Sequence, residues 1–245
     1  MFSNLNHYAG FQPVGMGNLD KDSAVRMGQG ILMQAQDPWW GGGEFVWARA
    51  TAAIRAQGLC TLTPVFDSAL QSWRYDATEV PNTANLGRPL CVAMGSFSGA
   101  GVYGWFMIAG VTPVNCSANV AADTTFGITA AGQAGANSAG KQILNARVMA
   151  PGTTTVAKAG CVAANGTNVL QVPNSDGWFV GVFLSGTGVA AGTVITSIDP
   201  SGRFVGLSAN TTAQVNGTVT ATYNNATIHF NVAHLNRPFA QGAIT

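Results

Sequence analysis

The stretch DPWWGGGEFVWARA, residues 37–50, separates two parts of the chain that differ in pattern. Residues 1–43 carry scattered Gly and Pro and show no sustained apolar period, which is typical of an extended arm. From Glu44 onward, apolar and alternating residues begin. Three consecutive glycines leave φ and ψ almost unrestrained. We therefore expect the run Gly41–Gly43 to act as a hinge between the arm and a folded domain.

Beyond this hinge the chain is built from short apolar or alternating runs, punctuated by Gly, Pro and Asn. The runs are EFVWARATAAI, GLCTLTPVF, SWRYDATEV, GRPLCVAMGSF, GVYGWFMIAGVTPV, TTFGITAAG and KQILNARVMAP. Short strands at this spacing are typical of an all-β barrel or sandwich. Helix-forming patterns are nearly absent, and glycine is frequent throughout. The predicted fold class is therefore all-β, with a small β-barrel or β-sandwich core.

Residues 157–223 differ in composition, being dominated by Thr, Val and Ser, with a β-turn signal at Asp199–Gly202. We expect them to form a second β-sandwich-like domain of immunoglobulin-like size, although the Cys…Trp…Cys core of a true immunoglobulin domain is missing. Residues 224–245 return to the earlier style. We therefore favour a barrel domain of residues 44–156 plus 224–245, interrupted by an insertion. The alternative is two sequential domains with a trailing strand.

Charged residues make up 9% of the 245-residue chain, whereas they make up roughly a quarter of an ordinary soluble protein. The formal net charge is +1. Such a surface creates no field that attracts nucleic acid or an anionic membrane. The N-terminus lacks the pattern of a secretory signal, and no apolar run reaches the roughly 20 residues that span a bilayer. A nearly neutral surface favours association. We expect a subunit of an assembly, although a composition-biased organism would show the same pattern.

Candidate chemistry is weak at every position tested. The G-x-G-x-x-G match at Gly99–Gly104 is followed by a strand-like run, where a dinucleotide site requires a helix. His229 and His234 are five residues apart on one predicted strand and so point to opposite faces. No carboxylate pair, P-loop or nucleophile elbow is present. We therefore expect no catalytic residues, no cofactor and no metal site, and hence no enzyme.

Cysteines and tryptophans complete the list of candidate residues. The four cysteines lie far apart with no C-x-x-C pair, so buried free thiols are expected. Trp47 and Trp105 lie in apolar strands and are expected in the core. Trp is enriched at interface hot spots, so the tryptophans beside the hinge are the best candidates for an anchor on another protein. The predicted partner-binding residues are Trp39, Trp40, Gly41, Gly42, Gly43, Phe11 and Met16.

Two longer stretches, GQGILMQAQDPWWGGGEFVWARA and RPLCVAMGSFSGAGVYGWFMIAGVTPV, resemble structural head proteins of tailed bacteriophages. The closing NRPFAQG fits the same pattern, and the middle unit resembles β-rich modules inserted into phage virion proteins. The residues that carry the likeness are Asp37, Pro38, Gly41, Gly42, Glu44, Phe45, Trp47, Pro89, Val92, Ala93, Gly104 and Trp105.

The resemblance implies a capsid decoration, or cement, protein: a virion structural protein on the outer surface of the assembled capsid, made in the host bacterial cytoplasm. Its partners would be the major capsid protein and further copies of itself, with a cyclic trimer as one arrangement. The alternative from the same source is a tail or fibre-associated receptor-binding protein. An enzyme with an unrecognised site is a third and less favoured interpretation.

Overall fold

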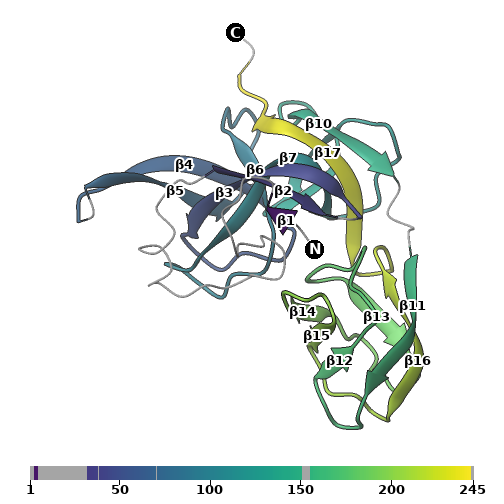
Figure 1. The fold of residues 1–245 in the computed structure, drawn as a ribbon. Coiled ribbons are helices and arrows are strands. Elements are labelled where there is room, and N and C mark those ends of the chain that lie inside the picture. Colours follow the sequence, from purple (N-terminus) through teal and green to yellow (C-terminus); the bar gives the residue numbers. More distant parts are fainter. Residues whose placement is uncertain (1–2, 5–31, 38, 70, 151–154, 244–245) are drawn as a thin grey trace.

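The computed structural model describes residues 3–4, 32–37, 39–69, 71–150 and 155–243. Every regular element in these residues is a β-strand, and the strands form two separate sheets (Figure 1). The predicted all-β class, with barrel-like domains, is therefore confirmed. No helix in the described part of the chain is long and apolar enough to cross a membrane.

The larger sheet forms the main domain and contains eleven strands. These are β1 (Ser3–Asn4), β2 (Leu32–Asp37), β3 (Gly41–Ala50), β4 (Leu59–Asp67), β5 (Ser72–Glu79), β6 (Leu90–Ala93), β7 (Tyr103–Cys116), β8 (Phe126–Ala130), β9 (Gln133–Ala136), β10 (Ile143–Ala150) and β17 (His229–Ala240). Most pairings are antiparallel, while β3 pairs with β5 and β7 with β9 in parallel.

Five of these strands close into a small barrel in the order β3-β5-β4-β6-β7, because β7 pairs back onto β3. Its interior is a compact apolar cluster that includes Val46, Leu62, Cys91 and Phe106. Cys60 of β4 lies directly opposite Cys91 of β6. Closure pairs the strand edges within the barrel, while the hairpin of β4 and β5 continues beyond the residues that pair with β3 and β6.

Strands β3 and β7 are buried on both faces. Side chains alternate across a strand, so Val46 and Phe106 point into the barrel while Trp47 and Trp105 point out of it. The two indoles meet edge to face, with ring centroids 5.0 Å apart, in a second and larger apolar cluster. Strands β8, β9, β10 and β17 contribute to this cluster. Because β3 and β7 each face an apolar core on both sides, their sequences are apolar at consecutive positions rather than alternating.

Strand β17 returns the chain to the main domain after the second sheet. It pairs with β7 over His229–Asn236 and with β10 up to Ala240. The strand continues through Pro238. The ladder to β10 is irregular between Leu235 and Phe239, and a bulge of this kind tolerates a proline within a strand.

The second sheet holds six strands, and all of them lie between β10 and β17 in the sequence. They are β11 (Thr155–Ala163), β12 (Val169–Gln171), β13 (Phe183–Gly186), β14 (Ile195–Ile198), β15 (Phe204–Leu207) and β16 (Val215–Thr222). An isolated bridge between Phe183 of β13 and Val194, the residue before β14, joins the two ends of the sheet. The ring is therefore closed, and we call this unit the inserted barrel. Its interior is a single apolar cluster.

Candidate interaction surface

The predicted hinge is part of a regular β-hairpin. Strands β2 and β3 pair in register from Leu32↔Val46 to Asp37↔Gly41. The backbone N–H groups of Trp39 and Trp40 both donate to Asp37 Oδ1, at 2.7 and 2.8 Å, which fixes the turn. This corrects the predicted boundary at residue 43, because residues 32–37 and 41–43 belong to the sheet of the main domain rather than to an extended arm.

The glycines of the hairpin have specific structural roles. Gly41 has φ of +82°, a conformation that residues with a side chain rarely adopt. Gly43 lies against β7, where an added Cβ would stand 2.4 Å from Met107 Cε and 3.0 Å from the Ala109 carbonyl oxygen. Gly42 has open space around it. The hinge interpretation of this run is therefore wrong, and close packing and turn geometry account for two of its three members.

Trp40 packs within the chain. Its ring lies 6.3 Å from that of Phe179 and 6.0 Å from that of Tyr223, both in the core of the inserted barrel. It also contacts the larger core of the main domain. Trp40 therefore joins the two domains. We expected it to anchor the chain on another protein, but in the structure it packs on the inserted barrel of the same chain.

Trp39 lies at the same junction but is half exposed. An added Cβ on Gly177 would come within 2.9 Å of its ring, so the indole rests directly on the backbone of the inserted barrel. Lys158 Nζ lies 5.8 Å from the ring centroid, a cation–π distance. Whether Trp39 also contacts another protein stays a prediction. Phe11 and Met16, the other two predicted partner-binding residues, lie outside the described residues.

The four cysteines are free and buried, as predicted. Burial raises the pKa of the Cys116 thiol to about 12, which disfavours the reactive thiolate there. The run Gly99–Gly104 leads into strand β7. Among the described residues, no three His, Cys, Asp or Glu side chains gather closely enough to hold a metal ion.

Two exposed large aromatic side chains of the main domain, Phe66 and Trp73, lie on the hairpin of β4 and β5. This hairpin extends to the left of the body in Figure 1, beyond the strands that pair with it. Phe66 and Trp73 face each other across its end, with ring centroids 5.5 Å apart, and are 46% and 65% exposed. Alternation places Pro64 and Tyr75 on the same face. We call the hairpin beyond Leu62 the aromatic arm.

A chain of charges supports the other face of the aromatic arm. Arg74 is buried and binds both Asp67 and Asp76, and Arg49 of β3 forms a two-pronged ion pair with Asp76, at 2.8 and 3.0 Å. Burial alone would raise the pKa of Asp76, but hydrogen bonds and charge from Arg49 and Arg74 outweigh it and lower that pKa. A lone two-stranded hairpin is marginal in water, so this cluster is what ties the projecting arm to the barrel.

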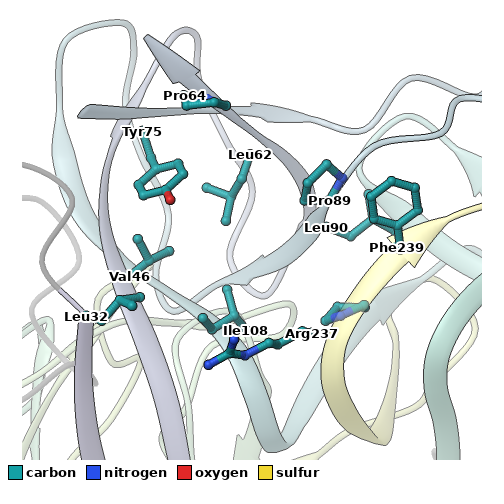
Figure 2. A pocket seen from close by; sticks show the side chains of 11 residues that line it. Leu32, Val46, Leu62, Pro64, Tyr75, Pro89, Leu90, Ile108, Arg237 and Phe239 are labelled. Atoms are coloured by element: carbon teal, nitrogen blue, oxygen red, sulfur yellow. The ribbon is translucent and has the colours of Figure 1, made fainter. Parts of the chain in front are cut away.

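A groove of about 450 Å³ opens at the end of the barrel, next to the base of the aromatic arm (Figure 2). We call it the barrel-mouth groove. It is lined by Leu32, Val46, Leu62, Pro64, Tyr75, Pro89, Leu90, Ile108, Arg237, Pro238 and Phe239. Its floor belongs to the barrel core, and its rim includes Leu32, 62% exposed, and Phe239, 37% exposed. The apolar surface that begins in the barrel interior therefore extends through the groove to the solvent-exposed face of the aromatic arm.

One ion pair lies at the rim of the groove. Arg237 donates from Nε and Nη2 to Glu44 Oε2, at 3.3 and 3.0 Å. Arg237 has φ of +50° at the irregular part of β17, an uncommon conformation for a residue with a side chain. A second cavity, of about 280 Å³, adjoins the groove and shares Leu32 and Arg237 with it. Strained residues of this kind concentrate at binding sites.

The outer edge of β4 is protected against the addition of another strand. Leu62 N donates to the Pro89 carbonyl oxygen at 3.1 Å, toward the β6 side. Alternation turns residue 64 the same way, and Pro64 has no N–H to donate. Pro64 therefore removes one backbone donor from this edge, which disfavours extension of the sheet there.

A second apolar face lies on the inserted barrel. Val162, Gln171 and Phe204 are consecutive cross-strand neighbours on β11, β12 and β15. Val162, Val169 and Phe204 are all more than two-fifths exposed. This second face is separate from the barrel-mouth groove, so the chain presents apolar side chains to solvent on both of its domains.

The groove and the arm were not among the predicted site residues. Their side chains come from strands spread over residues 32–239, and each run by itself has the pattern of an ordinary strand. A usable signal was the placement of Phe66 and Trp73 at the two ends of a hairpin loop, where large apolar residues are uncommon. No family model, curated protein or solved structure matches the chain.

Proposed function

We propose that this protein is a structural component of a tailed-bacteriophage virion, which binds the outer surface of the assembled capsid and stabilises it. The observation that carries the proposal is the pair of apolar faces on separate domains. A subunit that joins a lattice contacts more than one neighbour. Exposed apolar side chains that gather on one face mark protein interaction sites in soluble proteins.

The sequence resemblance supports the same proposal, and the structure explains what its motifs do. Gly41, Glu44 and Trp47 belong to the β2–β3 hairpin, and Gly104 and Trp105 to β7, which pairs with it. These residues build the two-faced strands at the centre of the main domain. The motif therefore describes a scaffold, and the proposed function lies in the surfaces that the scaffold presents.

Stabilisation would follow from mass action. A subunit that binds only the assembled shell stabilises it by the free energy of that binding, which grows with the concentration of free subunit. The low charge of the chain suits dense packing on a lattice, because neighbouring copies repel one another little. Binding, rather than a chemical step, is the whole of this function.

The direct test is co-sedimentation of the purified protein with empty shells of the phage whose genome encodes it. We expect saturable binding at a fixed ratio to the major capsid protein, and a rise in the temperature at which the shells disassemble. Shells that bind no protein over a range of concentrations and salt would refute the proposal. Binding only to tails would instead support the receptor-binding alternative.

A further inference from the structure

We propose that the barrel-mouth groove and the aromatic arm form a twofold contact with a second copy of this chain. The contact lies on the main domain and holds whether or not the proposed function is correct. The contact would cover the exposed apolar side chains of the groove and of the arm.

The shape of this surface suits a copy of itself. The arm extends about 16 Å beyond Leu62, from five residues at ~3.3 Å each, and carries its aromatic pair at the end. The groove is a concave apolar site beside the base of the arm. A twofold axis places the protruding part of each copy over the concave part of the other, as a self-complementary contact requires.

The apolar area is sufficient for an interface core. Leu32, Phe66, Trp73 and Phe239 are 37–65% exposed. At ~200 Å² for a large side chain, they expose roughly 400 Å² between them. A standard interface buries about 800 Å² on each partner. These four residues would supply about half of that, and the walls of the groove would supply much of the rest.

The charges at the rim complement themselves. Both Arg237 donors that form the ion pair reach Glu44 Oε2, and among the contacts of the described residues Glu44 Oε1 and Arg237 Nη1 have no partner. Each copy therefore keeps one free acceptor and one free donor group. Across a twofold axis, Arg237 of each copy binds Glu44 of the other, and the four charges sum to zero. Such exposed pairs set register and specificity more than affinity.

Sedimentation velocity and sedimentation equilibrium on the purified protein test the contact. We expect a dimer at micromolar concentration. Leu32→Glu places a carboxylate in the apolar contact, and we expect it to weaken dimerisation by ~100-fold or more, because burying an unpaired charge is strongly unfavourable. Met149→Glu is the matched control: Met149 is 53% exposed on β10, away from the groove, and its variant should remain a dimer.

The rim charges allow a sharper test. Arg237→Glu and Glu44→Arg each place like charges together across the axis, so each variant alone should dimerise more weakly than the wild type. Mixed in equal amounts, the two variants should form a heterodimer, because every contact across the axis is then between opposite charges. A variant that had simply lost its fold would not be rescued by mixing.

Three outcomes would overturn the proposal. The first is a wild-type monomer at ~100 μM, well above the Kd expected of a standard interface. The second is an oligomer with an odd number of copies, which a twofold contact cannot produce. The third is a dimer that survives Leu32→Glu unchanged, or rim variants that associate no more strongly when mixed than when alone. If the rim variants fail to fold, Trp73→Ser, at a side chain that is 65% exposed, replaces them and should weaken the dimer.

Discussion

Adding one methyl group at Gly43 or at Gly42 distinguishes a packed hairpin from a flexible hinge. In a hinge, both Gly→Ala changes would act alike, stabilising the fold by about 0.4–1 kcal/mol through a less flexible unfolded chain. In the structure the two sites differ. An added Cβ at Gly42 meets nothing within 4 Å, whereas at Gly43 it stands 2.4 Å from Met107 Cε, 3.0 Å from the Ala109 carbonyl oxygen and 3.2 Å from Phe45 Cζ.

The magnitude at Gly43 depends on which neighbour can move. Met107 Cε is the end of a flexible side chain, but Met107 is completely buried, so moving it disturbs the core. The Ala109 carbonyl belongs to the paired backbone of β7 and cannot retreat. Overpacking a core costs about 1–3 kcal/mol, from which the gain in the unfolded state is subtracted. We expect Gly43→Ala to lower the free energy of unfolding by about 1–2 kcal/mol.

The assay is urea unfolding followed by tryptophan fluorescence, with thermal melting as a second measurement. At about 2–4 °C per kcal/mol for a chain of this size, Gly43→Ala should lower Tm by several degrees, while Gly42→Ala should raise it by about 1–4 °C. Equal effects of the two substitutions, in either direction, would refute the packing argument and restore the hinge.

Three further predictions follow from other contacts. Trp40→Ala should uncouple the two domains, because Trp40 packs against both cores; calorimetry should then resolve two transitions, and a single undivided transition would contradict this role. The aromatic arm should loosen below about pH 4: the pKa of Asp76 is lowered in the fold from its ordinary value near 3.8, so its stabilisation is present above that value and lost as pH falls through the lower one. Circular dichroism of the aromatic region should report this change, and Asp76→Asn should abolish the acid transition at the expense of stability at pH 7. The free energy of unfolding of the Trp105→Phe variant should lie within about 1 kcal/mol of the wild-type value. The substitution removes a buried N–H that has no partner, which offsets part of the lost packing. A loss of stability near the ~3–5 kcal/mol of a full truncation to Ala would show that the N–H is satisfied after all.

The sequence by itself was enough for the fold class. Short alternating runs punctuated by Gly and Pro are local signals, and strands are found at most of the predicted runs. Burial of Trp47 and Trp105 could also be read from their place in continuously apolar runs. The four thiols were correctly predicted as free and buried, because their spacing leaves no partner close in sequence.

Only the tertiary structure decided the roles of the glycines and of Trp40. Three adjacent glycines suggest flexibility when only local conformational freedom is considered. Their actual roles depend on what lies opposite: β2 on one side, β7 on the other, and the inserted barrel beyond the turn. Pairing between residues 43 and 110 is non-local, and no local pattern encodes it.

The barrel-mouth groove, too, could not be predicted from local sequence patterns. Leu32, Tyr75 and Phe239 are far apart in the chain, and each occupies an ordinary position in its own strand. Closing the barrel brings them together at one end, and the strained backbone at Arg237 places a charge at the rim beside them. Sequence periodicity determines which residues face a core. Which of them remain uncovered, and beside which neighbours, is decided only when the strands close, because exposure is a property of the whole surface.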